Sequence, residues 1–549
     1  MSSSTAKVLA KGTFWGILSA FFIKFLGFFY TIMLPRLCPS KVEQGIFFYA
    51  LSVVAIIAVF SDLGLGPGAL GRYVPYYIGR KEYNHAKAVV RISLLAGTAF
   101  SLVCAILLIG SAGYLANFFN SPTLVPTIIQ VFYIMALYLF FMNFFLIAAN
   151  FLGGLKILKL SSHMNNIQSL AKLFLTAFFL VFLGPYAVNI AWGFTLSFLV
   201  ACVFGCFWAY REYRRIPLSE EIVDNRKLLV EMVPFGLVLV LLSSMSTING
   251  YVDRLMLGYL IGGTASLEMI AVYSFAVNLG AVIYLFSGPA VGIFLPVISE
   301  AWGRQDHLEI EKASSTLMRW ILFLSTPVFI TFVVFPREIL SILYGPSYGI
   351  GAMALVLYSI GIFFSLFSWP VYYGLSAMRK IGISIKILIV GMVINISLNA
   401  LLIPIYGIDG AAFGSAVSLV MMTGIYLYIR DRVYMRIPCN MYKGILAGFI
   451  VLGLLLCLKI SLGYSPDFVR EFSVSGGADQ EIIRKILKAA FLGLLGALTC
   501  GLYLFFVIIL RALETEDIEV IAGGMRRMGL PGGIIKKTEK MLGKRDIPA

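Results

Sequence analysis

The segment "STINGYVDRLMLGYLIG" (246–262) places two adjacent opposite charges, Asp253 and Arg254, in a stretch that is otherwise mostly apolar. The rest of the chain is similar in character: 60% of its 549 residues are hydrophobic and only 13% are charged, and the mean hydropathy is +0.92. A soluble chain of this length would need more charge to cover the surfaces of its domains. Apolar runs of about 20 residues recur along the chain, which predicts an all-α polytopic membrane protein.

We expect about fourteen transmembrane helices, so both termini lie on one side. The predicted limits are 12–35, 44–65, 89–112, 124–150, 164–184, 186–210, 232–261, 269–296, 316–335, 350–377, 383–405, 409–429, 441–462 and 486–510. Counting residues at the span ends, 31 of the 43 Lys and Arg fall on the side of the termini and seven on the other. The positive-inside rule then predicts a multi-pass protein of the cell (cytoplasmic) membrane with both termini cytoplasmic. The same distribution explains the net charge of +16 without nucleic acid.

An internal repeat of about 223 residues is visible in two pairs of motifs. "GPGALGRYVPYYIGR" (66–80) is similar to "GPAVGIFLPVISEAWGR" (288–304), and "FLGPYAVNIAWG" (182–193) is similar to "PIYGIDGAAFG" (404–414). Chance similarity between apolar segments is the alternative to a duplication. One period contains six spans, which preserves orientation, so a duplication predicts two six-helix lobes related by a pseudo-two-fold axis along the membrane normal.

The repeat also predicts the domain limits. We expect an N-terminal lobe at 1–215 (spans 1–6), a C-terminal lobe at 216–438 (spans 7–12), two extra C-terminal helices at 439–511 (spans 13–14), and a cytoplasmic basic tail at 512–549. Two lobes with a cleft between them favour alternating access by rocking.

Charges within the spans are the candidate functional residues. A charge at the bilayer centre costs about 2.5–3.5 kcal/mol on insertion scales, so such residues usually face a cavity and find partners. Lys24 lies in span 1, Lys172 in span 5, Asp253 and Arg254 in span 7, and Asp62 at the end of span 2. Neighbours on a helix point about 100° apart, so Asp253 and Arg254 each need a partner of their own.

Each of these charged residues also has an interpretation that involves no function in transport. Lys24, Lys172 and Arg254 could snorkel to the interface or form structural ion pairs, and Asp253 could belong to such a pair. Lys386 and Lys459 lie near span ends, where we expect snorkelling. The set within the spans is nonetheless net positive, which favours an anionic passenger over a cationic drug.

Enzyme chemistry is not indicated. The three His and seven Cys show no metal-ligand spacing, and neither a P-loop nor a GxSxG or HExxH motif occurs. We therefore expect neither a catalytic residue nor a bound metal or other cofactor.

Three segments carry a resemblance to a known family: "DLGLGPGALGRYVPYY" (62–77), "YVDRLMLGYLIG" (251–262) and "GPAVGIFLPVISEAWGR" (288–304). They resemble the polysaccharide biosynthesis flippases, the Wzx-type lipid-linked oligosaccharide flippases of the multidrug/oligosaccharidyl-lipid/polysaccharide exporter superfamily. The resemblance implies a V-shaped pair of six-helix lobes. It also implies movement of a glycan linked to polyprenyl phosphate or pyrophosphate from the cytoplasmic to the outer leaflet, for cell-surface polysaccharide assembly.

The resemblance also implies roles for the charges. Asp253 and Arg254 would line the cleft, with Arg254 or Lys24 at the phosphate and Lys172 as a further substrate contact. Asp253, with Asp62 as a second candidate, would hold a coupling H⁺ or Na⁺. Related lipid II flippases have two extra helices that form a lipid-tail groove, and a basic residue of their span 1 matches Lys24 by location only. Expected partners are the lipid-linked glycan, membrane lipids and other glycan-assembly membrane proteins.

Two other classes of function compete with a flippase. A multidrug antiporter of the same superfamily predicts twelve spans and a cleft dominated by carboxylates. A membrane-embedded glycan polymerase or ligase predicts a sizeable outer loop with catalytic groups. Here the longest outer loop, about 463–485, carries four acidic residues but no recognisable basic partner pattern.

Overall fold

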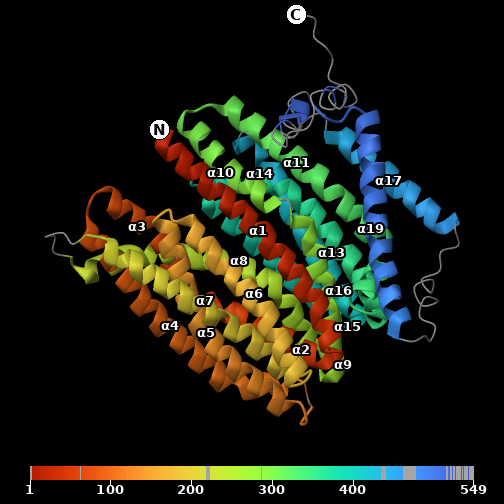
Figure 1. Cartoon of the computed structure of the whole chain (residues 1–549), viewed down its shortest axis with the longest axis horizontal. Helices are drawn as coiled ribbons and strands as arrows, with labels where there is room; N and C mark the ends of the chain where they lie inside the picture. Colours follow the sequence, from red (N-terminus) through yellow and green to blue (C-terminus); the bar gives the residue numbers. More distant parts are fainter. Residues whose placement is uncertain are drawn as a thin grey trace, which may run out of the picture. The chain divides into compact units, whose positions relative to one another are not determined.

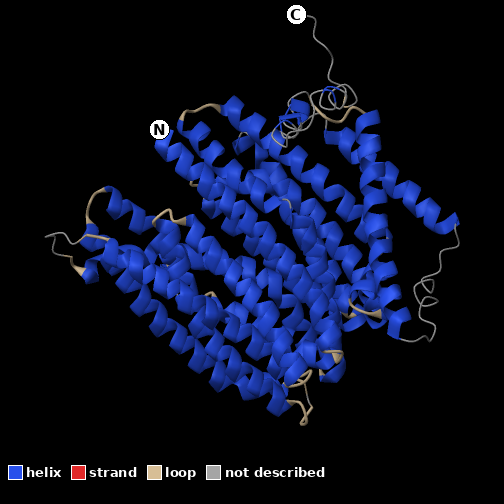
Figure 2. Ribbon diagram, in the orientation of Figure 1, coloured by secondary structure: helices blue, strands red, loops and turns tan. Residues whose placement is uncertain are grey.

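Helices make up all the regular structure in the described part of the chain (Figure 2). The structure is a computed structural model that describes residues 3–61, 63–119, 121–217, 223–285, 287–433, 441–461 and 478–514, with scattered tail residues between 517 and 542. Fourteen of its helical segments are long and apolar enough to cross a membrane. Each overlaps one of the predicted spans, which confirms the predicted fold class.

The spanning helices follow one another along the chain (Figure 1). Spans 1–7 are α1 (Ser3–Leu37), α2 (Lys41–Ala58), α4 (Tyr83–Asn117), α5 (Val125–Gly154), α6 (Leu158–Phe182), α7 (Ala187–Arg215) and α8 (Asn225–Ile261). Spans 8–14 are α9 (Gly263–Gly280) with η2 (Ala281–Leu285), α11 (His307–Val334), α13 (Ala352–Ser365) with α14 (Trp369–Ala377), α15 (Ile381–Tyr406), α16 (Ile408–Ile429), α17 (Met441–Ser461) and α19 (Ala478–Ile509). Shorter helices are η1 (Leu65–Ala69), α3 (Leu70–Gly79), α10 (Ser287–Gly303), α12 (Pro336–Leu343), η3 (Pro346–Gly351), η4 (Leu366–Ser368) and η5 (Arg430–Val433).

The chain breaks its helix at both Gly-Pro motifs. After α2 it passes through the π-helix η1 into α3, and after α9 it passes through the 3₁₀ turn η2 into α10. Proline has no N–H to donate, so a helix tolerates it poorly away from its first turn. At the first break Gly64 has φ +70°, and a Cβ there would lie 2.3 Å from the carbonyl oxygen of Gly236. Only glycine fits this turn, because both the dihedral angle and the approach of α8 exclude a side chain.

The same turns recur in the two repeats. Three turn residues with positive φ in the first repeat have counterparts 223 or 224 positions later: Lys81 (64°) and Gln305 (59°), Lys156 (62°) and Arg379 (59°), Gly184 (102°) and Gly407 (56°). The hydrogen bonds recur as well, since Glu82 N donates to Tyr77 O at 2.9 Å and Asp306 N donates to Ala301 O at 2.9 Å. Non-glycine residues with positive φ are uncommon, so their recurrence at the sequence period is difficult to attribute to chance.

Packing divides the chain into two units. Unit 1 contains residues 1–279 and 382–418, and unit 2 contains residues 280–381 and 419–549. The two units are defined by contacts between helices, whereas the predicted lobes at 1–215 and 216–438 are defined by the sequence repeat. The lobe limits and the pseudo-two-fold axis stay predictions.

Buried ion pairs fix the two additional spans within unit 2. Lys459 at the end of α17 pairs with the buried Glu338 of α12 at 2.8 Å, and its Nζ donates to Val334 O at 2.7 Å. Beyond α19, Asp517 and Glu514 pair with Arg319 of α11 at 3.2 and 2.5 Å. The expectation of snorkelling was wrong for Lys459, because it is ion-paired. Arg319 lies within the predicted span 316–335 and is buried.

Candidate functional site

Asp253 lies at the centre of a buried polar cluster in unit 1. Its side chain, 3% exposed, accepts hydrogen bonds from three neutral groups on three other helices. The donors are Tyr273 Oη of α9 at 2.5 Å, Ser415 Oγ of α16 at 2.5 Å and Asn399 Nδ2 of α15 at 2.7 Å. Asn395 extends the cluster, because its Nδ2 donates to Ser415 Oγ at 3.1 Å and its Oδ1 accepts from Asn399 at 3.2 Å.

Local sequence explains why these groups meet. Gly262 and Gly263 both have positive φ, 67° and 66°, and allow a tight turn between α8 and α9. Residues at similar distances from such a turn lie beside one another on antiparallel helices, which brings Tyr273 to Asp253. Asn395 and Asn399 are four residues apart, so they share a face of α15.

The side chain of Arg254 lies on a different face of α8 from that of Asp253. It is 6% exposed, its Nε donates to Ser274 Oγ at 2.9 Å, and one of its terminal nitrogens donates to Gly250 O at 3.2 Å. The guanidinium also lies over the ring of Tyr251, 5.1 Å from its centroid. A guanidinium has five N–H donors, and no carboxylate of the described residues pairs with this one. As the sequence predicted, Asp253 and Arg254 do not pair with each other.

Lys172 lies in a second polar group of unit 1. Its Nζ is 4.8 Å from the centroid of the Tyr30 ring, and the Tyr30 and Thr176 hydroxyls are both buried. Adding the repeat period of 223 to these three positions gives Asn395, Asp253 and Asn399. The two polar groups therefore occupy equivalent positions in the two repeats. The second has a carboxylate where the first has a tyrosine, and an amide where the first has an amine.

Other predicted site residues lie apart from the Asp253 cluster. Lys24 is exposed on α1, and within the described chain no hydrogen bond or ion pair joins Lys24 or Lys172 to Asp253 or Arg254. Asp62 lies outside the described residues. The structure therefore places Asp253 and Arg254 on different neighbours, and it does not bring the three predicted cations together in this conformation.

Sequence reasoning missed the partners of these charges. They are Tyr273, Ser274, Asn395, Asn399 and Ser415. One signal was available: "NISLN" (395–399) places two amides on one face of an otherwise apolar span. Amides in such a face are costly in lipid and therefore indicate a buried polar partner.

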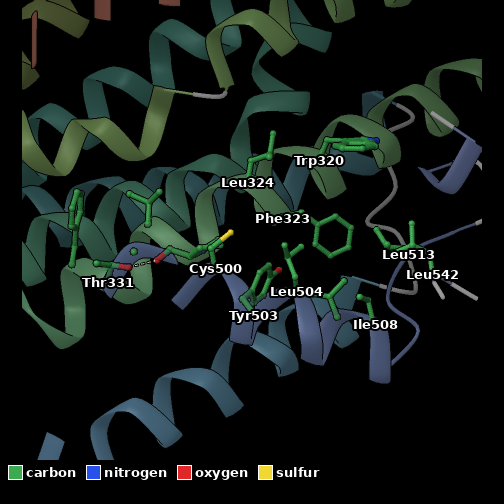
Figure 3. A pocket seen from close by; sticks show the side chains of 15 residues that line it. Trp320, Phe323, Leu324, Thr331, Cys500, Tyr503, Leu504, Ile508, Leu513 and Leu542 are labelled. Carbon is green, nitrogen blue, oxygen red and sulfur yellow. Dashed lines mark hydrogen bonds between the residues drawn. The ribbon is translucent and has the colours of Figure 1, made fainter. Parts of the chain in front are cut away.

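Unit 2 contains an apolar cavity between α11 and α19 (Figure 3). Its volume is about 580 Å³. Figure 3 shows Trp320, Phe323 and Leu324 of α11 together with Cys500, Tyr503 and Leu504 of α19 around it. Leu513 and Leu542, beyond the last span, complete the lining. Such a cavity can accommodate a hydrocarbon chain.

The spans, the broken helices and the charged and amide side chains buried between spans define the class as a membrane transporter of the multidrug/oligosaccharidyl-lipid/polysaccharide exporter superfamily. Within it, the chain belongs to the polysaccharide biosynthesis protein family, which it matches over residues 9–302. The resemblance inferred from the sequence is confirmed.

Curated relatives include flippases. An uncharacterised membrane protein of Methanocaldococcus jannaschii is 26% identical over 75% of this chain and 82% of its own length. The lipid II flippase MurJ of Bacillus subtilis is 21% identical over 91% of this chain and 96% of its own length. The chain is also 25% identical to Agl15 of Haloferax volcanii, named as a probable low-salt glycan biosynthesis flippase, over 34% of this chain and 39% of that protein.

Solved structures show the same fold. A structure of lipid II flippase MurJ in an inward closed conformation has a TM-score of 0.65 at 16% identity, and covers 90% of this chain and 97% of its own. An inward-facing multidrug resistance MATE family transporter has a TM-score of 0.61 at 16% identity, and covers 77% of this chain and 94% of its own. At these identities the likeness concerns the fold alone.

Proposed function

We propose that this protein is a flippase that moves an oligosaccharide linked to polyprenyl phosphate or pyrophosphate from the cytoplasmic to the outer leaflet by alternating access. Membership of the polysaccharide biosynthesis family and the flippases among its relatives support this class of substrate. The glycan passes through the polar interior while the polyprenyl chain stays in an apolar environment.

The proposal rests mainly on the burial of the Arg254 guanidinium and on its unused hydrogen-bond donors. A buried guanidinium is costly inside a membrane protein unless its donors are used, and two of its five donors are accounted for by Ser274 and Gly250. A phosphate presents several oxygens that match the guanidinium fork. A cationic drug offers no such acceptor and would be repelled. In this proposal Arg254 binds the lipid phosphate, with Lys24 and Lys172 as further contacts.

Asp253 is the proposed site for the coupling ion. Three neutral donors hold its carboxylate, no cation among the described residues pairs with it, and the side-chain oxygen of Asn399 is buried without a hydrogen-bond partner. These oxygens can hold Na⁺, or Asp253 alone can take a proton. Either would neutralise the carboxylate and change the contacts between α8, α9, α15 and α16.

The cavity between α11 and α19 is the proposed place for part of the polyprenyl chain. Its lining is almost entirely apolar and includes α19, one of the two additional spans. Lipid II flippases, which the sequence resembles, also have two extra helices. The fold likeness to MurJ extends over 90% of the chain, against 77% for the MATE transporter. This difference supports a flippase with fourteen spans.

The test replaces the proposed phosphate contacts. Removing a charge-assisted contact worth about 1.5–3 kcal/mol lowers affinity roughly ten- to a hundredfold, so Lys24→Ala and Arg254→Ala should abolish or cripple flipping at normal abundance. Arg254→Lys should rescue only in part, because an ammonium does not reproduce a bidentate grip.

Complementation of a flippase-deficient strain, with protein level measured in parallel, reports the outcome. Deletion of the gene should cause a lipid-linked saccharide to accumulate on the cytoplasmic side. Full complementation by both alanine variants would remove the phosphate-binding role.

A multidrug antiporter is the second candidate, and the buried Asp253 together with the fold likeness to a MATE transporter favours it. It predicts that Asp253→Asn raises the sensitivity of cells to cationic drugs while surface polysaccharide is unaffected. The flippase predicts the reverse pattern, so the two readouts in one strain distinguish them. The polymerase alternative depends on the loop at about 463–485, of which residues 463–477 lie outside the described chain.

A further inference from the structure

A second cavity in unit 1 combines an apolar lining with a basic rim. It lies among α4, α5 and α7, and its volume is about 330 Å³. Its walls are formed mainly by apolar side chains, among them Leu94, Phe144 and Phe151. Tyr210 and Tyr213 of α7 also line it, and both carry hydroxyl groups.

Three cations are attached to these two tyrosines. Arg91 donates its Nε to Tyr213 Oη at 2.9 Å, and Arg214 donates its Nε to Tyr210 Oη at 2.8 Å. Lys87, one turn before Arg91, holds its Nζ 5.5 Å from the centroid of the Tyr213 ring. In the described part of the chain no carboxylate pairs with any of the three. Each tyrosine accepts from an arginine, so its own hydroxyl hydrogen stays available to a further acceptor.

The burial of Lys87 indicates that the protein holds the basic rim of the cavity in place. It is only 9% exposed, and a lysine that merely snorkels would extend into water. Leu94 and Tyr210, at 37% and 57% exposed, mark the open side of the cavity. The cations therefore lie beside an entrance to an apolar space, which is the arrangement that an anionic amphiphile fits.

The cavity is distinct from the Arg254 site. Arg91 lies near the start of α4 and Arg214 at the end of α7, on the side that the Lys/Arg distribution predicts to be cytoplasmic. Arg254 lies 29 residues along α8 from its start on that same side, which is about 43 Å at 1.5 Å per residue. The two sites are therefore near opposite faces of the membrane.

We propose that this cavity binds an anionic phospholipid of the cytoplasmic leaflet, with its phosphate on Arg91, Arg214 and Lys87 and part of one acyl chain in the cavity. A volume of about 330 Å³ is at the low end for a ligand site, so it takes a section of one chain and leaves the rest in the bilayer. Basic pockets between helices on the cytoplasmic side suit such headgroups. The occupant is a resident membrane lipid and not the transported one, because the site opens beside the spans and lies far from Arg254.

The test measures lipid-dependent stabilisation of the full chain in detergent. Dioleoyl phosphatidylglycerol, added in steps, should raise the thermal unfolding midpoint, and dioleoyl phosphatidylcholine with the same chains should not. In Arg91→Gln/Arg214→Gln the apparent affinity for phosphatidylglycerol should fall about fivefold for each cation removed, the ratio expected for a basic residue near an anionic surface. Both side chains are exposed, so the midpoint in phosphatidylcholine should stay at the wild-type value.

Arg80 provides a matched control. It is exposed on the same side and donates to Tyr76 Oη at 2.6 Å, with its guanidinium 5.4 Å from the Tyr76 ring centroid, but neither residue lines the cavity. Arg80→Gln removes the same side-chain charge and a hydrogen bond to a tyrosine hydroxyl, although Arg80 also pairs with Glu82 at 2.9 Å, and it should leave the affinity unchanged. Ala209→Leu, which narrows the cavity without changing charge, should weaken binding.

Four outcomes would overturn the proposal. They are equal stabilisation by the two lipids, an unchanged affinity in the double variant, an equal loss in Arg80→Gln, and equal stabilisation by inorganic phosphate alone. Displacement of phosphatidylglycerol by equimolar polyprenyl phosphate, with the same loss in the double variant, would assign the cavity to the transported lipid and would also overturn it.

Discussion

Replacement of Asp253 by asparagine tests the coupling role most directly, because the change removes one charge and almost no volume. The carboxylate accepts three hydrogen bonds from neutral donors. A hydrogen bond to a charged group contributes about 1.5–3 kcal/mol and a neutral one about 0.5–1.5 kcal/mol. The amide oxygen of asparagine can keep the bonds from Tyr273 and Ser415 as neutral ones, and the bond from Asn399 is lost because its donor then faces the amide –NH2 group. Together these changes lower the free energy of unfolding by about 4 kcal/mol. This is an upper value, because the asparagine variant no longer buries a charge.

The assay is reversible unfolding in mixed micelles at several NaCl concentrations, with choline chloride at constant ionic strength, and at several pH values. If Asp253 takes the coupling ion, the wild type should gain about 2.7 kcal/mol when the ion is in hundredfold excess over its dissociation constant. Asp253→Asn should lose both this stability and the dependence on ion concentration. Tyr273→Phe removes one donor and should cost about 1.5–3 kcal/mol while the ion dependence persists.

Glu338→Gln is the control for loss of a buried carboxylate. Glu338 is 2% exposed and pairs with Lys459 in unit 2, so its replacement should lower stability and leave the ion dependence intact. An ion dependence that is the same in Asp253→Asn and in the wild type would refute the coupling role and leave Asp253 as a structural group.

Three further predictions concern topology, the tail and the repeat. In a background without native cysteines, a cysteine at Ser121 or Gly263 should react with an impermeant thiol reagent from outside and one at Asn84 should not; labelling at Asn84 in sealed cells would reverse the orientation. Arg319→Ala should cost about 3–5 kcal/mol, because it leaves Asp517 buried and unpaired, and removing both partners should cost less than the sum of the single changes, as a double-mutant cycle can show. In an experimental structure the first six spans should superpose on the next six by a rotation near 180° about the membrane normal, and an axis in the membrane plane would exclude the parallel duplication.

Hydropathy predicted the fourteen spans, because a bilayer accepts only long apolar helices and the chain has little room for other patterns. The Gly-Pro motifs predicted corresponding features in the two repeats, and the structure places a broken helix at each. Such features are local in sequence, so residue type and spacing are enough to find them.

The partners of the buried charges were less predictable, since they are distant in sequence. Asn399 is 146 residues from Asp253, and Asp517 is 198 residues from Arg319. Nothing in a single sequence states which helices pack together. The angle between neighbours on a helix did predict that Asp253 and Arg254 separate, because that argument needs only the geometry of α8.

The ion pairs of Lys459 and Arg319 have a mechanical consequence. Lys459 holds the end of α17 at Glu338 of α12 and at Val334, the last residue of α11. Arg319 holds the segment after α19 near the middle of α11. Val334 and Arg319 are 15 residues apart, or about 22 Å along the helix. Contacts at two points this far apart restrain α11 from rotating about either of them. The end of α17 and the segment after α19 are therefore both held against α11 and the start of α12, which makes these parts of unit 2 a mechanically linked group.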